Sequence, residues 1–121
     1  MRQSEAIRFV IEIEVSDIDG FKAAANDMVA ISDDEPGTLV YDWYLDEDTG
    51  QGRLYEAYAS FEALDAHIAG PVFTEVGPRI ISTCTFVRMD AFGNAPPERR
   101  AGPGIAPTTW WGDPFAAVSA T

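Results

Sequence analysis

The order strand, helix, strand occurs twice in this chain of 121 residues, and this repeat most constrains how the chain can fold. The first half begins at residues 7–15, where every second residue is apolar, which is the period of a β-strand. Apolar side chains then recur at helical spacing over residues 18–31, and a second alternating strand covers residues 38–45. The second half, residues 53–89, has the same order of elements.

Residues that start and stop helices mark the first half. Ser16 or Asp17 can cap the first helix through a side-chain oxygen. The helix should end near Ser32, because the polar residues that follow lead into Pro36-Gly37, which cannot continue a helix. A polar turn at residues 46–52 then predicts an antiparallel connection to the third strand, residues 53–59.

In the second half, Ser60 is expected to cap a second helix. The apolar stripe of this helix consists of Phe61, Leu64 and Ile68. Gly70-Pro71 should interrupt it, Pro71 opening a new turn, and Gly77-Pro78 should break it again. A fourth strand over residues 81–89 is then expected to place Met89 on the face opposite Cys84 and Phe86.

This order of elements predicts an α+β fold, the ferredoxin-like βαββαβ arrangement with a four-stranded antiparallel sheet. Both helices should cover one face of the sheet. The other face also carries apolar side chains, so we expect it to meet a second sheet. A two-fold homodimer that forms a dimeric α+β barrel would cover both faces.

The composition changes after Asp90. We therefore expect residues 1–92 to form the ferredoxin-like domain and residues 93–121 to form a C-terminal arm rich in proline, glycine and tryptophan. A free tail would not normally expose Trp110, Trp111 and Phe115. The arm is thus expected to dock, either on its own domain or on a partner.

The formal net charge of −12 excludes several classes of partner. A surface this acidic repels phosphate backbones and anionic lipids, so we expect neither nucleic-acid nor membrane binding. No apolar run approaches the roughly 20 residues needed to span a bilayer. The single cysteine, Cys84, cannot form an internal disulfide and is typical of a cytoplasmic protein.

Two ionisable residues are candidates for catalysis. His67, the only histidine, lies on the flank of the second helix and could accept a proton at the rim of a pocket, or be a partly exposed residue with no role. Glu56 shares a strand face with Leu54 and Tyr58. If it is buried its pKa should be raised, which would make it a second base; otherwise it is solvated or paired with an arginine.

Aromatic side chains could form a flat slot for a polycyclic substrate. The candidate substrate-binding residues are Tyr41, Trp43, Tyr58 and Phe73. Each is equally compatible with an ordinary core or interface position. No cluster of histidine, cysteine and carboxylate has metal-ligand spacing, so we expect no metal, and no glycine-rich phosphate-binding loop is present.

Residues 5–92 resemble the antibiotic biosynthesis monooxygenase family of small dimeric α+β barrels. The motifs that carry the resemblance are Glu35-Pro36-Gly37-Thr38, then Arg53-Leu54-Tyr55-Glu56-x-Tyr58-x-Ser60-x-Glu62-Ala63-Leu64-x-Ala66-His67, then Phe73. His67 and Glu56 match motif positions, and Tyr58 falls where relatives often carry an aromatic residue, frequently tryptophan. Haem-degrading relatives carry a haem-ligating histidine near residues 73–77, and its lack here argues against haem.

The resemblance implies that some members oxygenate phenols, quinols or anthrones with O2 and no metal or flavin. The first hypothesis is therefore a cofactor-independent monooxygenase acting on a small aromatic, polyketide-like substrate. The second is an isomerase or cyclase of a small enolisable substrate that uses the same acid–base pair without O2. The third is a non-catalytic dimeric binding module whose contact is the aromatic arm.

Overall fold

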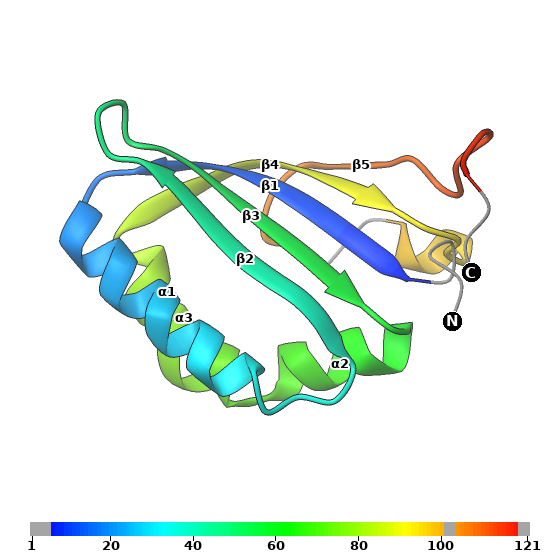
Figure 1. Ribbon diagram of the computed structural model, residues 1–121, viewed down its shortest axis with the longest axis horizontal. Helices are drawn as coiled ribbons and strands as arrows, with labels where there is room; N and C mark the ends of the chain where they lie inside the picture. Colours follow the sequence, from blue (N-terminus) through cyan, green and yellow to red (C-terminus); the bar gives the residue numbers. More distant parts are fainter. Residues whose placement is uncertain (1–5, 101–103, 119–121) are drawn as a thin grey trace.

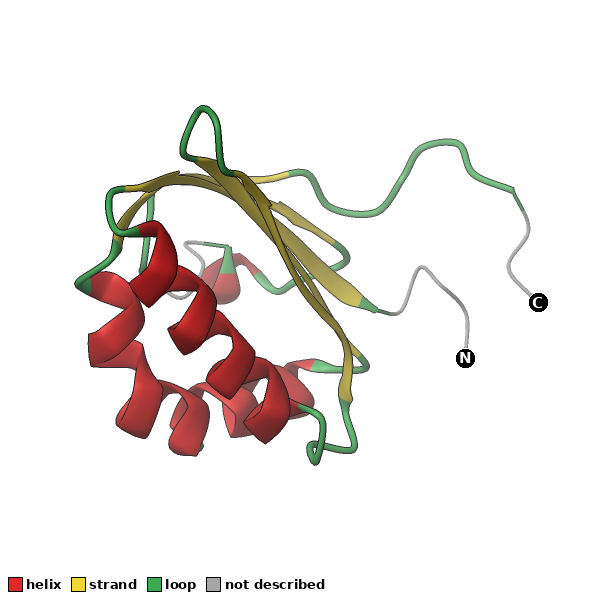
Figure 2. Cartoon of the chain, turned by 60° about the vertical axis from the view of Figure 1, so that its left-hand side comes forward, coloured by secondary structure: helices red, strands yellow, loops and turns green. Residues whose placement is uncertain are grey.

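The structure is a computed structural model that describes residues 6–100 and 104–118. It forms a curved sheet with all its α-helices on the concave side (Figures 1 and 2). The sheet has five strands in the order β2-β3-β1-β4-β5. The strands are β1 (Ile7–Val15), β2 (Thr38–Asp46), β3 (Gln51–Tyr58), β4 (Cys84–Phe92) and β5 (Thr108–Trp110). The helical segments are α1 (Ile18–Ser32), α2 (Phe61–Ala69), η2 (Val72–Val76), α3 (Gly77–Ile81) and η3 (Pro97–Arg99).

β1 lies at the centre of the sheet, antiparallel to both β3 and β4. Its alternating pattern is confirmed: Phe9, Ile11 and Ile13 are buried against the helices. Burying a side chain of this size stabilises the fold by about 1.5–3 kcal/mol. The strand therefore supplies the floor of the core between the sheet and the helices.

β4 contains an irregularity that the alternation did not predict. The pairing of β1 with β4 shifts between Glu12 and Ile13, which pair with Arg88 and Phe86, so Val87 is the extra residue of a bulge. A bulge reverses which residues face the core beyond it. Met89 is consequently buried on the same side as Phe86, and its expected place on the opposite face is wrong.

Both expected helix caps form, through Asp17 for α1 and Ser60 for α2. Pro71 starts a new helical segment, as expected, and the chain continues through η2 into α3. The expected break at Gly77-Pro78 is wrong, because Pro78 occupies the first turn of α3, where a proline needs no hydrogen-bond partner for its nitrogen. β4 accordingly begins only at Cys84.

The expected number of four strands is also wrong, because the arm contributes β5, which pairs in parallel with β4. Trp110 of β5 stacks on Phe61 with ring centroids 6.1 Å apart and meets Phe9 edge-on at 5.9 Å. Its indole N–H donates to the carbonyl of Gly93 at 2.7 Å. This part of the arm thus docks on its own domain, whereas Phe115 is exposed. The division of the chain at residue 92 stays a prediction.

Candidate active site

His67 lies on the inner face of α2 and is fully buried. The buried residues of this helix are Leu64 and His67, one turn apart, while Ile68, expected in the apolar stripe, is 36% exposed. The imidazole therefore occupies the position that an apolar residue of an amphipathic helix would take. Burial of a titratable ring in the core is unusual and needs polar partners.

Glu35, in the loop between α1 and β2, provides that partner. Its Oε1 lies 2.6 Å from Nδ1 of His67, and the Thr38 hydroxyl donates to the same oxygen at 2.8 Å. The Glu35 side chain is 20% exposed, so the pair connects the buried ring with the molecular surface. Among the described residues, nothing hydrogen-bonds the other ring nitrogen, Nε2.

Glu56 and Tyr58 form a second polar pair on β3. Both side chains face the core, and the Tyr58 hydroxyl donates a hydrogen bond to the Glu56 carboxyl group. Burial raises the pKa of Glu56 to about 7, and the hydrogen bond from Tyr58 lowers it only partly. Near neutral pH this carboxyl group can therefore either donate or accept a proton.

Aromatic rings surround His67 on three sides. The distances between ring centroids are 4.8 Å to Tyr41, 5.1 Å to Tyr58 and 5.3 Å to Phe73. Burial and the nearby carboxylates of Glu56 and Glu35 raise the pKa values of both tyrosines, which therefore stay protonated hydrogen-bond donors. The interior is thus apolar at its walls and carries only a few convergent polar atoms.

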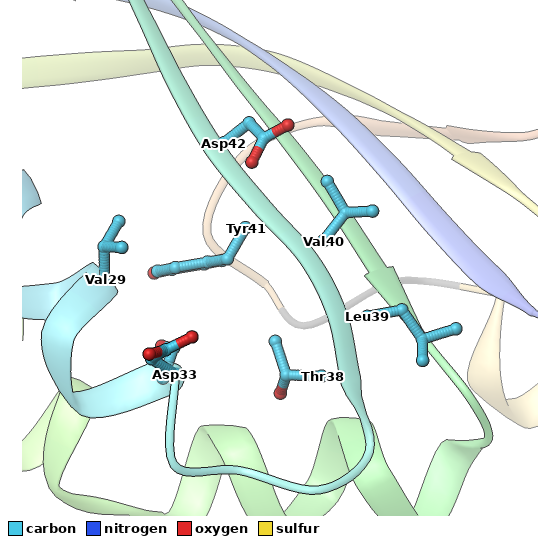
Figure 3. A pocket seen from close by; sticks show the side chains of 8 residues that line it. Val29, Asp33, Thr38, Leu39, Val40, Tyr41 and Asp42 are labelled. Atoms are coloured by element: carbon cyan, nitrogen blue, oxygen red, sulfur yellow. The ribbon is translucent and has the colours of Figure 1, made fainter.

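Two hollows open on the side of this cluster that faces α1 and β2. One has a volume of about 310 Å³ and includes Ser32 and Thr38 in its lining; the other has about 350 Å³ and includes Trp43. Both are lined by Tyr41, whose side chain reaches from β2 toward α1 (Figure 3). His67 lines neither hollow, so Tyr41 is the wall between these spaces and the buried imidazole.

The structure brings all the candidate residues from the sequence into one region. His67, Tyr41, Tyr58 and Phe73 are in direct contact, Glu56 joins through Tyr58, and Trp43 meets Tyr41 edge-on at 5.6 Å. Their assignment to catalysis and substrate binding stays a prediction.

Sequence reasoning gave no role to Glu35, although it stands in the Glu-Pro-Gly-Thr motif before β2. Its position in that motif is the one indication in the sequence of a role for Glu35. The contact with His67 joins residues 32 positions apart, so no local pattern predicts it.

Two structural features are absent from the described part of the chain. Across residues 6–100 and 104–118, no group of three or more histidine, cysteine and carboxylate side chains is placed to hold a metal ion. No helix in these ranges has the length and apolar character that crossing a membrane requires.

The fold and the buried polar pairs define a small ferredoxin-like α+β protein with ionisable side chains buried between its helices and its sheet. The model of the antibiotic biosynthesis monooxygenase family matches residues 7–77, and the chain belongs to this family.

Solved structures show the same fold. MupZ from Pseudomonas fluorescens superposes with a TM-score of 0.74 at 18% identity, over 94% of this chain and 96% of that one. SnoaB from Streptomyces nogalater, a cofactor-independent oxygenase, superposes with a TM-score of 0.65 at 15% identity, over 76% of this chain and 95% of that one. A conserved protein from Methanosarcina mazei superposes with a TM-score of 0.65 at 19% identity, over 76% of this chain and 95% of that one. A comparison with curated proteins finds no match.

Proposed function

We propose that the protein is a cofactor-independent monooxygenase that oxidises a phenol, quinol or anthrone with O2. The observation that carries the proposal is the fully buried His67, whose Nε2 has no partner among the described residues and is surrounded by aromatic rings. Membership of the family and the described activity of SnoaB support the reaction type. A planar substrate suits walls made of Tyr41, Tyr58 and Phe73, and it reaches His67 only when the Tyr41 side chain, which separates the two hollows from the ring, moves aside.

In this reaction His67 removes a proton from the activated carbon of an anthrone, which leaves an enolate. The enolate gives one electron to O2, and the two radicals combine to a peroxide anion on the same carbon. Protonation by Glu56 gives the hydroperoxide, which loses water to leave the quinone. One anthrone and one O2 thus become one quinone and one water, and the second oxygen atom of O2 leaves in the water.

Oxygen uptake with 1,8-dihydroxyanthrone as probe tests this function. In the presence of a chelator and without flavin, we expect the protein to consume O2 and form quinone in a one-to-one ratio, above the rate without protein. A matched solution of the Glu62→Gln variant, altered on the exposed face of α2, should behave like the wild type. A requirement for added flavin or iron contradicts the proposal.

A second candidate function follows from the pKa of Glu56, which is raised to about 7. A buried acid of this strength, linked through Tyr58 to a histidine, could serve with that histidine as an acid–base pair that isomerises or cyclises an enolisable substrate without an oxidant. The two functions separate under argon: the monooxygenase stops without O2, whereas an isomerase or cyclase turns over at the same rate.

We also propose that the protein is a cytoplasmic homodimer joined through the outer face of its sheet. Val10 and Tyr55, paired neighbours on that face, are only half-buried, and Val87 is 40% exposed. Light scattering should give twice the chain mass of 13.2 kDa, and Val10→Glu should shift the protein toward the monomer. Val29→Glu, at an exposed position of α1, is the control. A wild-type mass of one chain at micromolar concentration rules out the dimer.

A further inference from the structure

We propose that Glu35 is a positioning residue: it holds the His67 ring with its proton on Nδ1, so that Nε2 is the atom that accepts a proton. The role of Glu35 in turnover rests on the proposed function, but the position of the ring proton does not. The proposal stands on contacts between the loop before β2 and the inner face of α2.

The chemistry of the hydrogen-bond partners indicates which nitrogen of His67 carries the proton. An ionised carboxylate only accepts hydrogen bonds, and Glu35 Oε1 lies 2.6 Å from Nδ1, so Nδ1 must donate. The Thr38 hydroxyl donates to the same oxygen at 2.8 Å, which leaves that oxygen as an acceptor on both sides. The neutral ring has one N–H, and Nε2 therefore carries the lone pair.

Glycine at position 37 makes this contact possible. A Cβ atom on Gly37 would lie 2.4 Å from the Cβ of Ala63, so any larger residue would push the loop away from α2. The loop is further fixed by the hydrogen bond from the Ala59 amide to the Gly37 carbonyl, at 2.9 Å. The packing of the loop backbone against α2 thus fixes the position of Glu35 next to His67.

The groups that face His67 come from four elements. Glu35 approaches from the loop, Tyr41 from β2, Tyr58 with its bound Glu56 from β3, and Phe73 from η2. Burial raises the pKa values of Tyr41, Tyr58 and Glu56, which favours their neutral forms. Glu35 is then the carboxylate in direct contact with the ring, and its charge stabilises the imidazolium that forms when Nε2 takes a proton.

Nitrogen NMR of the full chain labelled with ¹⁵N-histidine tests the proposal directly, because His67 is the only histidine. A titration first locates the pH range in which the ring is neutral. In that range the wild type should show a protonated Nδ1 and an unprotonated Nε2. The Glu35→Ala variant should instead show a mixture of the two tautomers, and the exposed control Glu62→Gln should match the wild type. A wild-type ring protonated on Nε2 overturns the proposal, even if Glu35→Ala does not fold.

Kinetics of the oxygen-uptake reaction test the consequence for turnover. Glu35→Gln keeps the size of the side chain and an oxygen that can accept from Nδ1, but it loses the charge. The imidazolium that forms during the reaction then lacks its stabilising carboxylate, so kcat should fall by about 100-fold with KM within about threefold. An unchanged kcat in Glu35→Gln shows that the charge of Glu35 does not assist turnover and overturns that part of the proposal. If no variant and no wild type consumes O2, the proposed function fails, while the NMR result still decides the position of the ring proton.

Discussion

Replacing His67 with asparagine is expected to lower kcat for oxidation of 1,8-dihydroxyanthrone by about 10²–10⁴-fold, the usual contribution of a general base. The amide N–H of asparagine can replace Nδ1 as the donor to Glu35, while nothing replaces Nε2. The variant should therefore fold with the Glu35 contact kept and lose only the proton acceptor. The measurement is the initial rate of O2 consumption above the rate without protein.

Two observations keep this experiment decisive. The far-ultraviolet circular dichroism and melting temperature of His67→Asn should remain close to those of the wild type, which excludes unfolding as the cause. If the folded variant oxidises the anthrone at the wild-type rate, His67 is not the base. The monooxygenase mechanism given above would then be wrong at its first step.

The second large effect concerns stability and pH. The pKa of Glu56 rises from 4.5 to about 7 on folding, because the carboxyl group is buried. The folded protein therefore binds this proton more tightly than the unfolded chain does. The contribution of the Glu56 proton to the free energy of unfolding is fully present below pH 4.5 and is lost as the pH rises through about 7. The difference between the two pKa values corresponds to about 3 kcal/mol.

Glu56→Gln isolates this contribution, because glutamine keeps the carbonyl oxygen that accepts from Tyr58 and cannot ionise. Between pH 4.5 and pH 8, the free energy of unfolding of the wild type should fall by about 3 kcal/mol relative to this variant. Urea unfolding of both proteins at each pH gives the difference. If the difference in free energy of unfolding between the two proteins stays constant across this pH range, the pKa of Glu56 is not raised by folding.

The parts of the fold that could be predicted from sequence are those with local causes. The alternation of β1 and the caps at Asp17 and Ser60 depend on residues that are neighbours along the chain. The bulge at Val87 depends on pairing with β1, some 75 positions earlier, and β5 depends on a free edge of β4. Alternation within one segment carries no information about either.

The candidate site divides in the same way. Glu56 and Tyr58 are two positions apart on one strand, so their shared face follows from the strand period. The spacing of Phe61, Leu64 and Ile68 predicts His67 on the flank of its helix, beside the apolar stripe, whereas the structure buries it. Its burial is explained by Glu35, and that contact arises only where the loop at Gly37 meets Ala63. The shared face of Glu56 and Tyr58 thus follows from local periodicity, whereas the contact of Glu35 with His67 depends on tertiary packing.

The way in which Trp110 lies on Phe61 affects how the helix of His67 is supported. Phe61 is the first residue of α2, and Arg99 covers the same ring from 4.5 Å while its guanidinium meets Asp65 at 2.6 Å. Side chains of the C-terminal arm therefore support the helix near its start. The position of the His67 helix thus depends on residues that lie outside the family match at residues 7–77.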